Sequence, residues 1–173
     1  ESQTLEQLQQ YVQEWGARES AIFVLAQDNL RAFARDYRKR LEQFGDRDPQ
    51  ARFGELFVGR EDGSTRLRER FFAGSSVTGV IGKYVDLDAD LQRRLVVGYD
   101  LLAQYGPAWQ NRFANLYITT PEHAILIFWP DKPWGLNANS WEVNAKLALN
   151  EPDHDPVSII DDRLLRIGST NIN

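Results

Sequence analysis

The first part of the chain carries a long, regular pattern of apolar positions. They recur in steps of three and four with one missed beat at Glu19: Leu5, Leu8, Val12, Trp15, Ile22, Ala26, Leu30, Phe33, Tyr37, Leu41 and Phe44. This spacing is typical of a helix with one buried stripe. The other faces carry mainly Gln, Glu, Arg, Asp and Lys, and no proline interrupts the run. The pattern therefore predicts a helix over residues 5–44.

This helix is longer than the body to which it belongs. Roughly 40 residues that rise about 1.5 Å each make a rod of about 60 Å, whereas a compact domain of about 170 residues is roughly 40 Å across. We therefore expect its N-terminal half to pack less on the domain than its C-terminal half. The alternative is a break near Gly16 into two core helices, because glycine costs a helix about 1 kcal/mol relative to alanine. Gly45 suits a left-handed cap at the end of the helix.

Two short β-prone stretches follow. Residues 46–50 form a linker, and residues 53–59 and 65–70 each predict a short strand. Asp62 and Gly63 lie between the two stretches, and an Asp-Gly pair in that place is a strong signal of a β-hairpin.

Residues 74–82 are rich in glycine and serine and predict a flexible loop. A phosphate-binding loop ending at Gly82 and Lys83 would require glycine at position 77 and serine or threonine at position 84. The chain has Val77 and Tyr84 there, so we expect no nucleotide binding.

A second helix is predicted over residues 89–105, with Asp88 as its N-cap. Its buried face is marked by Leu91, Leu95, Tyr99 and Leu102. Gly106 and Pro107 are expected to end it, and residues 108–113 to form a connector.

A second hairpin is predicted from residues 115–120 and 124–129, with Pro121 and Glu122 at its turn. The return stretch is the most apolar in the chain, which is typical of a strand buried on both faces.

The last part of the chain alternates loops with short elements. Residues 130–141 predict an irregular loop, held in shape by Pro130, Pro133 and Gly135. The later segments predict a helix at residues 140–148, a strand at residues 157–160 and a helical turn at residues 161–166.

The order of elements predicts an α+β fold: a long N-terminal helix followed by an antiparallel sheet flanked by helices. We expect three parts. Residues 1–45 form the long helix, residues 46–156 the main module, and residues 157–173 a tail that starts further strands or a truncated second module.

Composition narrows the possible functions. A net charge of -5 argues against binding to nucleic acids or to anionic membranes, which requires a basic surface. The chain has no cysteine, which excludes disulfides, thiolate metal sites and cysteine nucleophiles. The chain contains no run of about 18 apolar residues, so we expect no membrane span within it. The chain starts at Glu1 and contains no methionine, so we expect it to be a piece of a longer protein.

Candidate catalytic chemistry is sparse. His154 stands between two aspartates, which could ligate a metal, but a hydrophilic turn is the favoured interpretation. His123 follows Glu122 without an obvious serine partner for a nucleophilic triad. We expect no catalytic residues, no metal, no cofactor and no enzymatic activity of this chain itself.

Aromatic residues are the better lead to a binding site. Six lie on elements that should converge: Tyr99, Tyr105, Trp109, Tyr117, Trp129 and Trp134. Such residues build plain core, but they also line small-molecule pockets. We predict a cavity on the sheet face under the loop at residues 130–141, lined by Tyr117, Trp129 or Trp134.

Polar groups near this loop could orient a ligand. They are Asp131, Lys132, Asn137 and Asn139. Arg112 could bind a ligand carboxylate through two hydrogen bonds, although a surface acid is the favoured partner.

Residues 111–130 (NRFANLYITTPEHAILIFWP) and 133–137 (PWGLN) resemble Cache-type, PAS-like sensor domains of bacterial transmembrane receptors. The preceding run at residues 99–109 (YDLLAQYGPAW) and the long helix are similar to the same family, so the likeness spans roughly residues 5–150. The arginine-plus-aromatic signature of its amino-acid-binding members is not recognisable here.

The resemblance implies an extracytoplasmic, periplasmic sensor that binds a small molecule and signals through a receptor in the inner membrane. Among histidine kinases, chemoreceptors and diguanylate cyclases, it favours a histidine kinase in two-component signalling. It also implies a homodimer formed through the N-terminal helix, and membrane contact only through spans outside this chain. The alternative is a soluble protein-interaction domain that uses the long helix as a coiled-coil handle.

Overall fold

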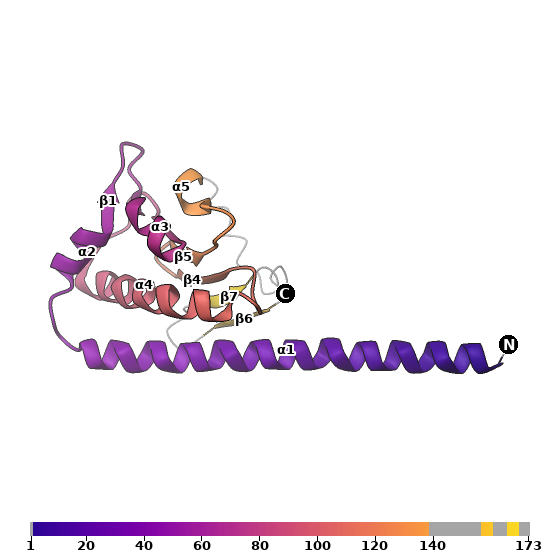
Figure 1. Ribbon diagram of the computed structural model, residues 1–173. Coiled ribbons are helices and arrows are strands. Elements are labelled where there is room, and N and C mark those ends of the chain that lie inside the picture. Colours follow the sequence, from indigo (N-terminus) through magenta and orange to yellow (C-terminus); the bar gives the residue numbers. More distant parts are fainter. Residues whose placement is uncertain (1, 139–156, 161–165, 170–173) are drawn as a thin grey trace.

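The computed structural model describes residues 2–138, 157–160 and 166–169. In chain order the elements are α1 (Ser2–Phe44), α2 (Gln50–Leu56), β1 (Phe57–Gly59), β2 (Thr65–Leu67), α3 (Arg70–Ser75), β3 (Val77–Ile81), α4 (Ala89–Trp109), β4 (Leu116–Thr120), β5 (Ala124–Phe128), α5 (Trp134–Asn137), β6 (Val157–Ile160) and β7 (Arg166–Ser169). They form an antiparallel sheet flanked by helices, with a long helix at the N-terminus (Figure 1). The predicted α+β fold is confirmed.

Helix α1 is one continuous rod that extends well beyond the body (Figure 1). It passes through Gly16 without a break, and it ends at Gly45, whose φ of 60° is the left-handed cap conformation. Its C-terminal half buries Ala26, Leu30, Phe33, Ala34, Tyr37 and Leu41. In its N-terminal half the apolar side chains remain exposed, including Ile22, which the stripe predicted to be buried. The expected difference in packing between the two halves is confirmed.

The predicted first hairpin is present, but its first strand is shorter than expected. Residues 53–56 belong to α2, and the strand begins only at Phe57. Phe53 and Leu56 are both buried at helical spacing, and the Phe53 ring stacks on Phe57 with centroids 4.7 Å apart. Helical packing against the core therefore overrides the β-propensity of this segment. On the other side of the turn, β2 ends at Leu67 and Arg70 begins α3.

The glycine-rich segment at residues 74–82 is not a flexible loop, as the sequence predicted, but contains the interior strand β3. All five of its residues are buried. A Cβ atom on Gly79 would lie 2.6 Å from Cδ2 of Leu126. The glycine is thus required by close packing between neighbouring strands, which is a different use of glycine from loop flexibility.

Helix α4 begins as predicted and ends later. The Asp88 side chain accepts a hydrogen bond from the Leu91 amide at 2.8 Å, and the predicted buried face is confirmed. The predicted end at Gly106 and Pro107 is wrong, because the helix continues to Trp109. The last turn is held by ring contacts: Trp109 lies 4.8 Å from Tyr105, 5.9 Å from Phe113 and 6.2 Å from Phe33, centroid to centroid.

The predicted second hairpin is confirmed as β4 and β5. Both strands are fully buried, whereas only the return strand was expected to be so. The strand order is β1-β2-β3-β5-β4-β7-β6, so β4 is covered on its other edge by the tail. The strand predicted at residues 157–160 is β6, but Arg166 begins β7 instead of ending a helical turn. The predicted helix at residues 140–148 and most of the predicted turn lie outside the described residues.

The two faces of the sheet have different covers. On one face α4 lies between the middle of the sheet and α1, and its Gly98 approaches the side chains of Leu126 and Ile118, whereas α1 contacts β6 and β7 directly (Figure 1). On the other face α5 packs against β3, with Trp134 and Ala138 beside Val80 and Ile125. Within the segment predicted to be an irregular loop, residues 134–137 thus form a short helix that lies on the sheet.

Candidate functional site

The sheet face beneath α5 carries the residues from which a ligand site could be built. Directly paired residues of neighbouring strands point to the same face, so the register places Thr78, Ile127 and Tyr117 in one row. The next row contains Val80, Ile125 and Thr119, with Arg66 beside Val80. All seven side chains are buried. The described part of this face therefore combines hydroxyl groups with aliphatic side chains.

Helix α5 is fixed to this face at a single residue, Gly135. The Gly135 amide donates a hydrogen bond to Oγ1 of Thr78 at 3.0 Å, and Nη1 of Arg66 donates to the Gly135 carbonyl at 2.8 Å. A Cβ atom on Gly135 would lie 2.6 Å from the Thr78 hydroxyl oxygen, so only glycine allows this approach. The position of α5 above the sheet is thus set by two side chains of the sheet itself.

The charge of Arg66 is compensated within the protein. Its Nε donates to Oγ of Ser64 at 3.1 Å, and its Nη2 lies 3.3 Å from Oδ2 of Asp62. Hydrogen bonds from the side chain and backbone of Ser64, together with Arg66, hold the pKa of Asp62 below its usual range. Arg66 therefore serves to position α5.

The structure brings some of the predicted site residues together and separates others. Tyr117 is buried on this sheet face, and Trp134 lies half-buried on α5 above it. Trp129 is half-buried just after β5, with Nζ of Lys132 5.3 Å from its ring centroid. Asn137 is exposed at the end of α5.

The two remaining predicted residues are not part of this arrangement. Asn139 lies outside the described residues. Arg112 is exposed, and its Nη1 donates to Oδ1 of Asn29 on α1 at 3.2 Å, so its contact is with an amide of the rod and not with the expected acid.

Sequence reasoning missed Arg66 and Thr78, the two residues that hold α5. Thr78 was hidden because its segment was interpreted as a loop. The apolar β-branched residues around Gly79 were the signal that this segment is a strand. For Arg66 the sequence carried no comparable signal, since a single arginine in a short strand is usually exposed.

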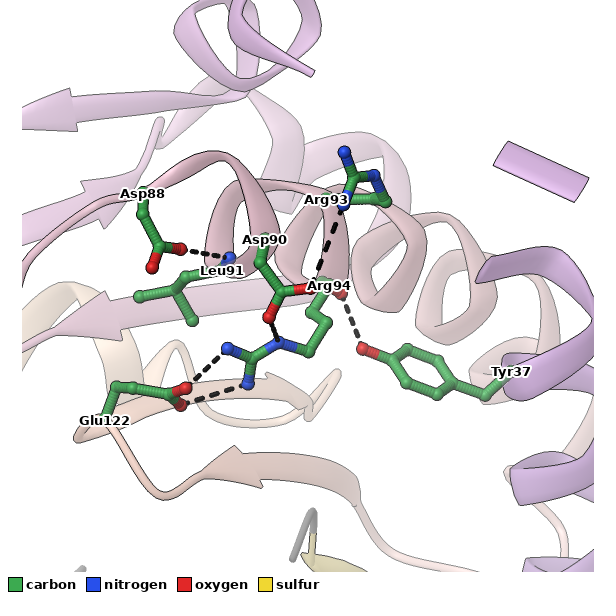
Figure 2. Close-up of polar contacts among 7 residues, drawn as sticks. All are labelled: Tyr37, Asp88, Asp90, Leu91, Arg93, Arg94 and Glu122. Atoms are coloured by element: carbon green, nitrogen blue, oxygen red, sulfur yellow. Dashed lines mark hydrogen bonds and ion pairs between the residues drawn. The ribbon is translucent and has the colours of Figure 1, made fainter. Parts of the chain in front are cut away.

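A second polar cluster connects α1, α4 and the turn between β4 and β5 (Figure 2). The buried guanidinium of Arg94 donates two hydrogen bonds to the Glu122 carboxylate, one of them from Nη1 to Oε2 at 3.0 Å. Its Nε also donates to Oδ2 of Asp90 at 3.0 Å, and the Tyr37 hydroxyl donates to the Arg94 carbonyl at 2.8 Å. The hydrogen bonds from Arg94 hold the pKa of Glu122 below its usual range. This cluster fixes the relative position of three elements.

Further polar contacts join the rod to α4. The Tyr105 hydroxyl donates to Oδ2 of Asp36 at 2.8 Å, and the same carboxylate lies 3.3 Å from Nη2 of Arg40. Burial and the Asp36 hydrogen bond raise the pKa of Tyr105. Helix α4 is therefore tied to α1 near both of its ends, by Arg94 and by Tyr105.

Comparisons with protein-family models, with curated proteins and with solved structures gave no match to this chain. Among the described residues, no helix has the length and apolar character needed to cross a bilayer. The same residues contain no group of three or more His, Asp or Glu side chains that could hold a metal ion. His123 is exposed in the turn between β4 and β5, and His154 lies outside the described residues.

Proposed function

We propose that this chain is the extracytoplasmic, ligand-sensing domain of a membrane-bound signalling receptor, with a histidine kinase as the favoured parent. The observation that carries the proposal is the placement of α5. A short helix is anchored through Gly135 to a buried sheet face that offers Tyr117 and Thr119 as polar groups. A small ligand on this face would be enclosed between the sheet and its cover, which is a typical arrangement for small-molecule sites.

The contacts on the opposite face support transmission of a signal. Helix α4 packs on the sheet and is tied to α1 by Tyr37 and Tyr105. A ligand that binds one arrangement of α5 and the sheet better than another shifts the population toward it. Because α4 contacts both the sheet and the rod, such a shift would reach α1. The proposal includes a homodimer formed through α1, a periplasmic location, and attachment to the inner membrane through spans outside this chain.

A thermal-shift screen of the whole chain with small carboxylates, amines and sugars tests the proposal. A compound that binds should raise the melting temperature in a saturable way. The variant Trp134→Ala should lose this rise while remaining folded. Tyr84→Ala is the matched control, because Tyr84 is a fully exposed aromatic residue away from α5. If no compound class gives a saturable shift, or if Trp134→Ala binds as the unchanged chain does, the sensing site is not where we place it.

The alternative function is a protein-interaction domain that uses α1 as a handle. The exposed apolar residues in the N-terminal half of the rod favour it. This function requires association through α1 but no small-molecule effect on the body. A chain that associates through α1 and shows no ligand-dependent shift in the screen would support the alternative over the sensor.

A further inference from the structure

The free half of α1 presents an apolar surface that is wider than one stripe. At about 100° per residue, Leu8, Trp15 and Ile22 form its centre line. One flank carries Leu5 and Val12, and the other carries Tyr11 and Leu25. These side chains are exposed, from 47% for Ile22 to 68% for Tyr11. A helix of this length with an unpaired apolar surface and an internal glycine is only marginally stable alone in water, so this half requires a partner.

The body determines which flank can take a parallel helix. The flank of Leu5 and Val12 continues through Ala26 into Leu30 and Phe33, which are buried against the body. A parallel helix on that flank would run into α4. The flank of Tyr11 and Leu25 instead continues to Asn29, which is half-buried and accepts a hydrogen bond from Arg112, and to Ala32, which is partly exposed. A parallel helix on this flank can follow α1 from Leu8 to Leu25, where the side chains of α1 are exposed.

The residues on the open side have the spacing of a coiled coil. Leu8, Tyr11, Trp15, Arg18, Ile22 and Leu25 follow one another in strict steps of three and four. In heptad terms, Leu8, Trp15 and Ile22 occupy a positions, and Tyr11, Arg18 and Leu25 occupy d positions. Such a seam fits a second helix with the same repeat.

The single charge in this seam indicates the identity of the partner. Arg18 lies in a shallow hollow lined also by Tyr11, Glu14 and Trp15. In a parallel pair, the hole that receives a d residue includes the adjacent e residue of the other helix. In an in-register pair of this chain, that e residue is the second copy's Glu19. Each Arg18 then meets a carboxylate of the other chain, and Glu14 supplies another from one turn earlier on its own helix.

We propose that two copies of this chain associate through α1 as a parallel, in-register coiled coil, with Arg18 paired to Glu19 of the second copy. The inference rests on the homodimer in the proposed function and adds the face, the direction and the polar layer. The interface uses Leu8, Tyr11, Trp15, Ile22 and Leu25, with Leu5, Val12 and Glu19 along its edge at e positions.

Cysteine cross-linking tests the direction, because the chain has no cysteine of its own. In a parallel, in-register pair, Leu8→Cys and Ile22→Cys should each give a covalent dimer with themselves under mild oxidation. Ala17→Cys, on the opposite side of the helix, should stay monomeric under denaturing conditions. A disulfide that forms only when the Leu8→Cys and Ile22→Cys chains are mixed would show antiparallel pairing and overturn the proposal.

The charge layer is tested by sedimentation of the whole chain. Arg18→Glu should weaken the dimer by at least about tenfold, because carboxylates then face each other. The double variant Arg18→Glu, Glu19→Arg should restore association. Arg35→Glu makes the same charge change on an exposed part of α1 away from the seam and should have no effect.

The outcomes for the dimer and for the ligand are separable. A chain that stays monomeric at all concentrations and forms no Ile22→Cys disulfide overturns the dimer, even if it gives a ligand-dependent thermal shift. A dimer with the predicted cross-links but no ligand response supports this inference while contradicting the sensor function.

Discussion

The hydroxyl of Tyr37 on α1 donates a hydrogen bond of 2.8 Å to the main-chain carbonyl of Arg94 on α4. The same arginine holds Glu122 in the turn between β4 and β5 through its guanidinium. One residue of α4 thus contacts the rod through its backbone and the sheet through its side chain. This arrangement predicts that the rod and the turn between β4 and β5 move together, and that the contacts at Arg94 contribute to global stability.

Tyr37→Phe should destabilise the protein by about 1 kcal/mol, the usual net contribution of a buried hydrogen bond. The ring, which is almost completely buried, remains in place, so packing is preserved. Urea denaturation followed by circular dichroism measures the change. An unchanged midpoint would mean that the hydroxyl contributes no net stability to the contact between α1 and α4.

The ion pair of Arg94 with Glu122 predicts a pH dependence of stability. Because the folded-state pKa of Glu122 is lowered, its contribution is present above the unfolded-state pKa and is lost as pH falls through the folded value. The substitution Glu122→Gln should therefore lower the free energy of unfolding most near neutral pH and only a little in acid. Since the Glu122 side chain is 37% exposed and screened by solvent, we expect a cost of about 1 kcal/mol at pH 7.

The difference in unfolding free energy between Glu122→Gln and the unchanged chain, measured from pH 7 down to acid, checks the sign. A difference that grows as pH falls would contradict it. Asp131→Asn serves as a control, because Asp131 is an exposed acid outside the cluster.

A single methyl group added at Gly106 should have a large effect on the stability of the protein. A Cβ atom there would lie 2.3 Å from Cγ of Phe128. Gly106→Ala should therefore destabilise the protein by about 2 kcal/mol or more, despite the higher helix propensity of alanine. Gly54→Ala in α2 is the matched control, because a Cβ atom at Gly54 would meet nothing within 4 Å, and it should be neutral or slightly stabilising. Equal melting temperatures for the two variants would contradict this packing argument.

The sequence predicted elements best where one local signal acted alone. The helical period of α1, the Asp88 cap of α4 and the Asp62–Gly63 turn all appear in the structure. Predictions failed where tertiary packing changed the meaning of a residue. Gly79 serves strand packing, and Pro107 stays within a helix because aromatic contacts hold the last turn around Trp109.

The sequence predicted that Trp134 lies over the sheet, but it did not predict how α5 is anchored there. The proximity of Trp134 to the sheet followed from the apolar strand and the stiff loop beside it. The contacts of Arg66 and Thr78 with Gly135 join segments that are 69 and 57 residues apart in sequence. No local pattern specifies such a distant pairing, so these two residues emerged only from the strand register.

The substitution Thr78→Val tests whether the Thr78 hydroxyl holds α5 in place. The substitution preserves the shape of the side chain but removes the acceptor of the Gly135 amide, which is then buried without a partner. Such a loss costs about 1–3 kcal/mol. The cost should appear first as local opening of α5, because this helix has only four residues and is fixed to the sheet through Gly135.

Hydrogen exchange of the Gly135 amide measures this opening. Its rate should increase by about tenfold or more, because a free-energy loss of this size increases the population of the open state by that factor. Thr65→Val is the control, because Thr65 pairs with Ile81 and faces the other side of the sheet. If Gly135 exchanges at the same rate in both variants, the Thr78 hydroxyl contributes nothing to the anchoring of α5. If exchange accelerates only in Thr78→Val, the hydroxyl is part of the anchor, and the same variant should weaken any ligand enclosed beneath α5.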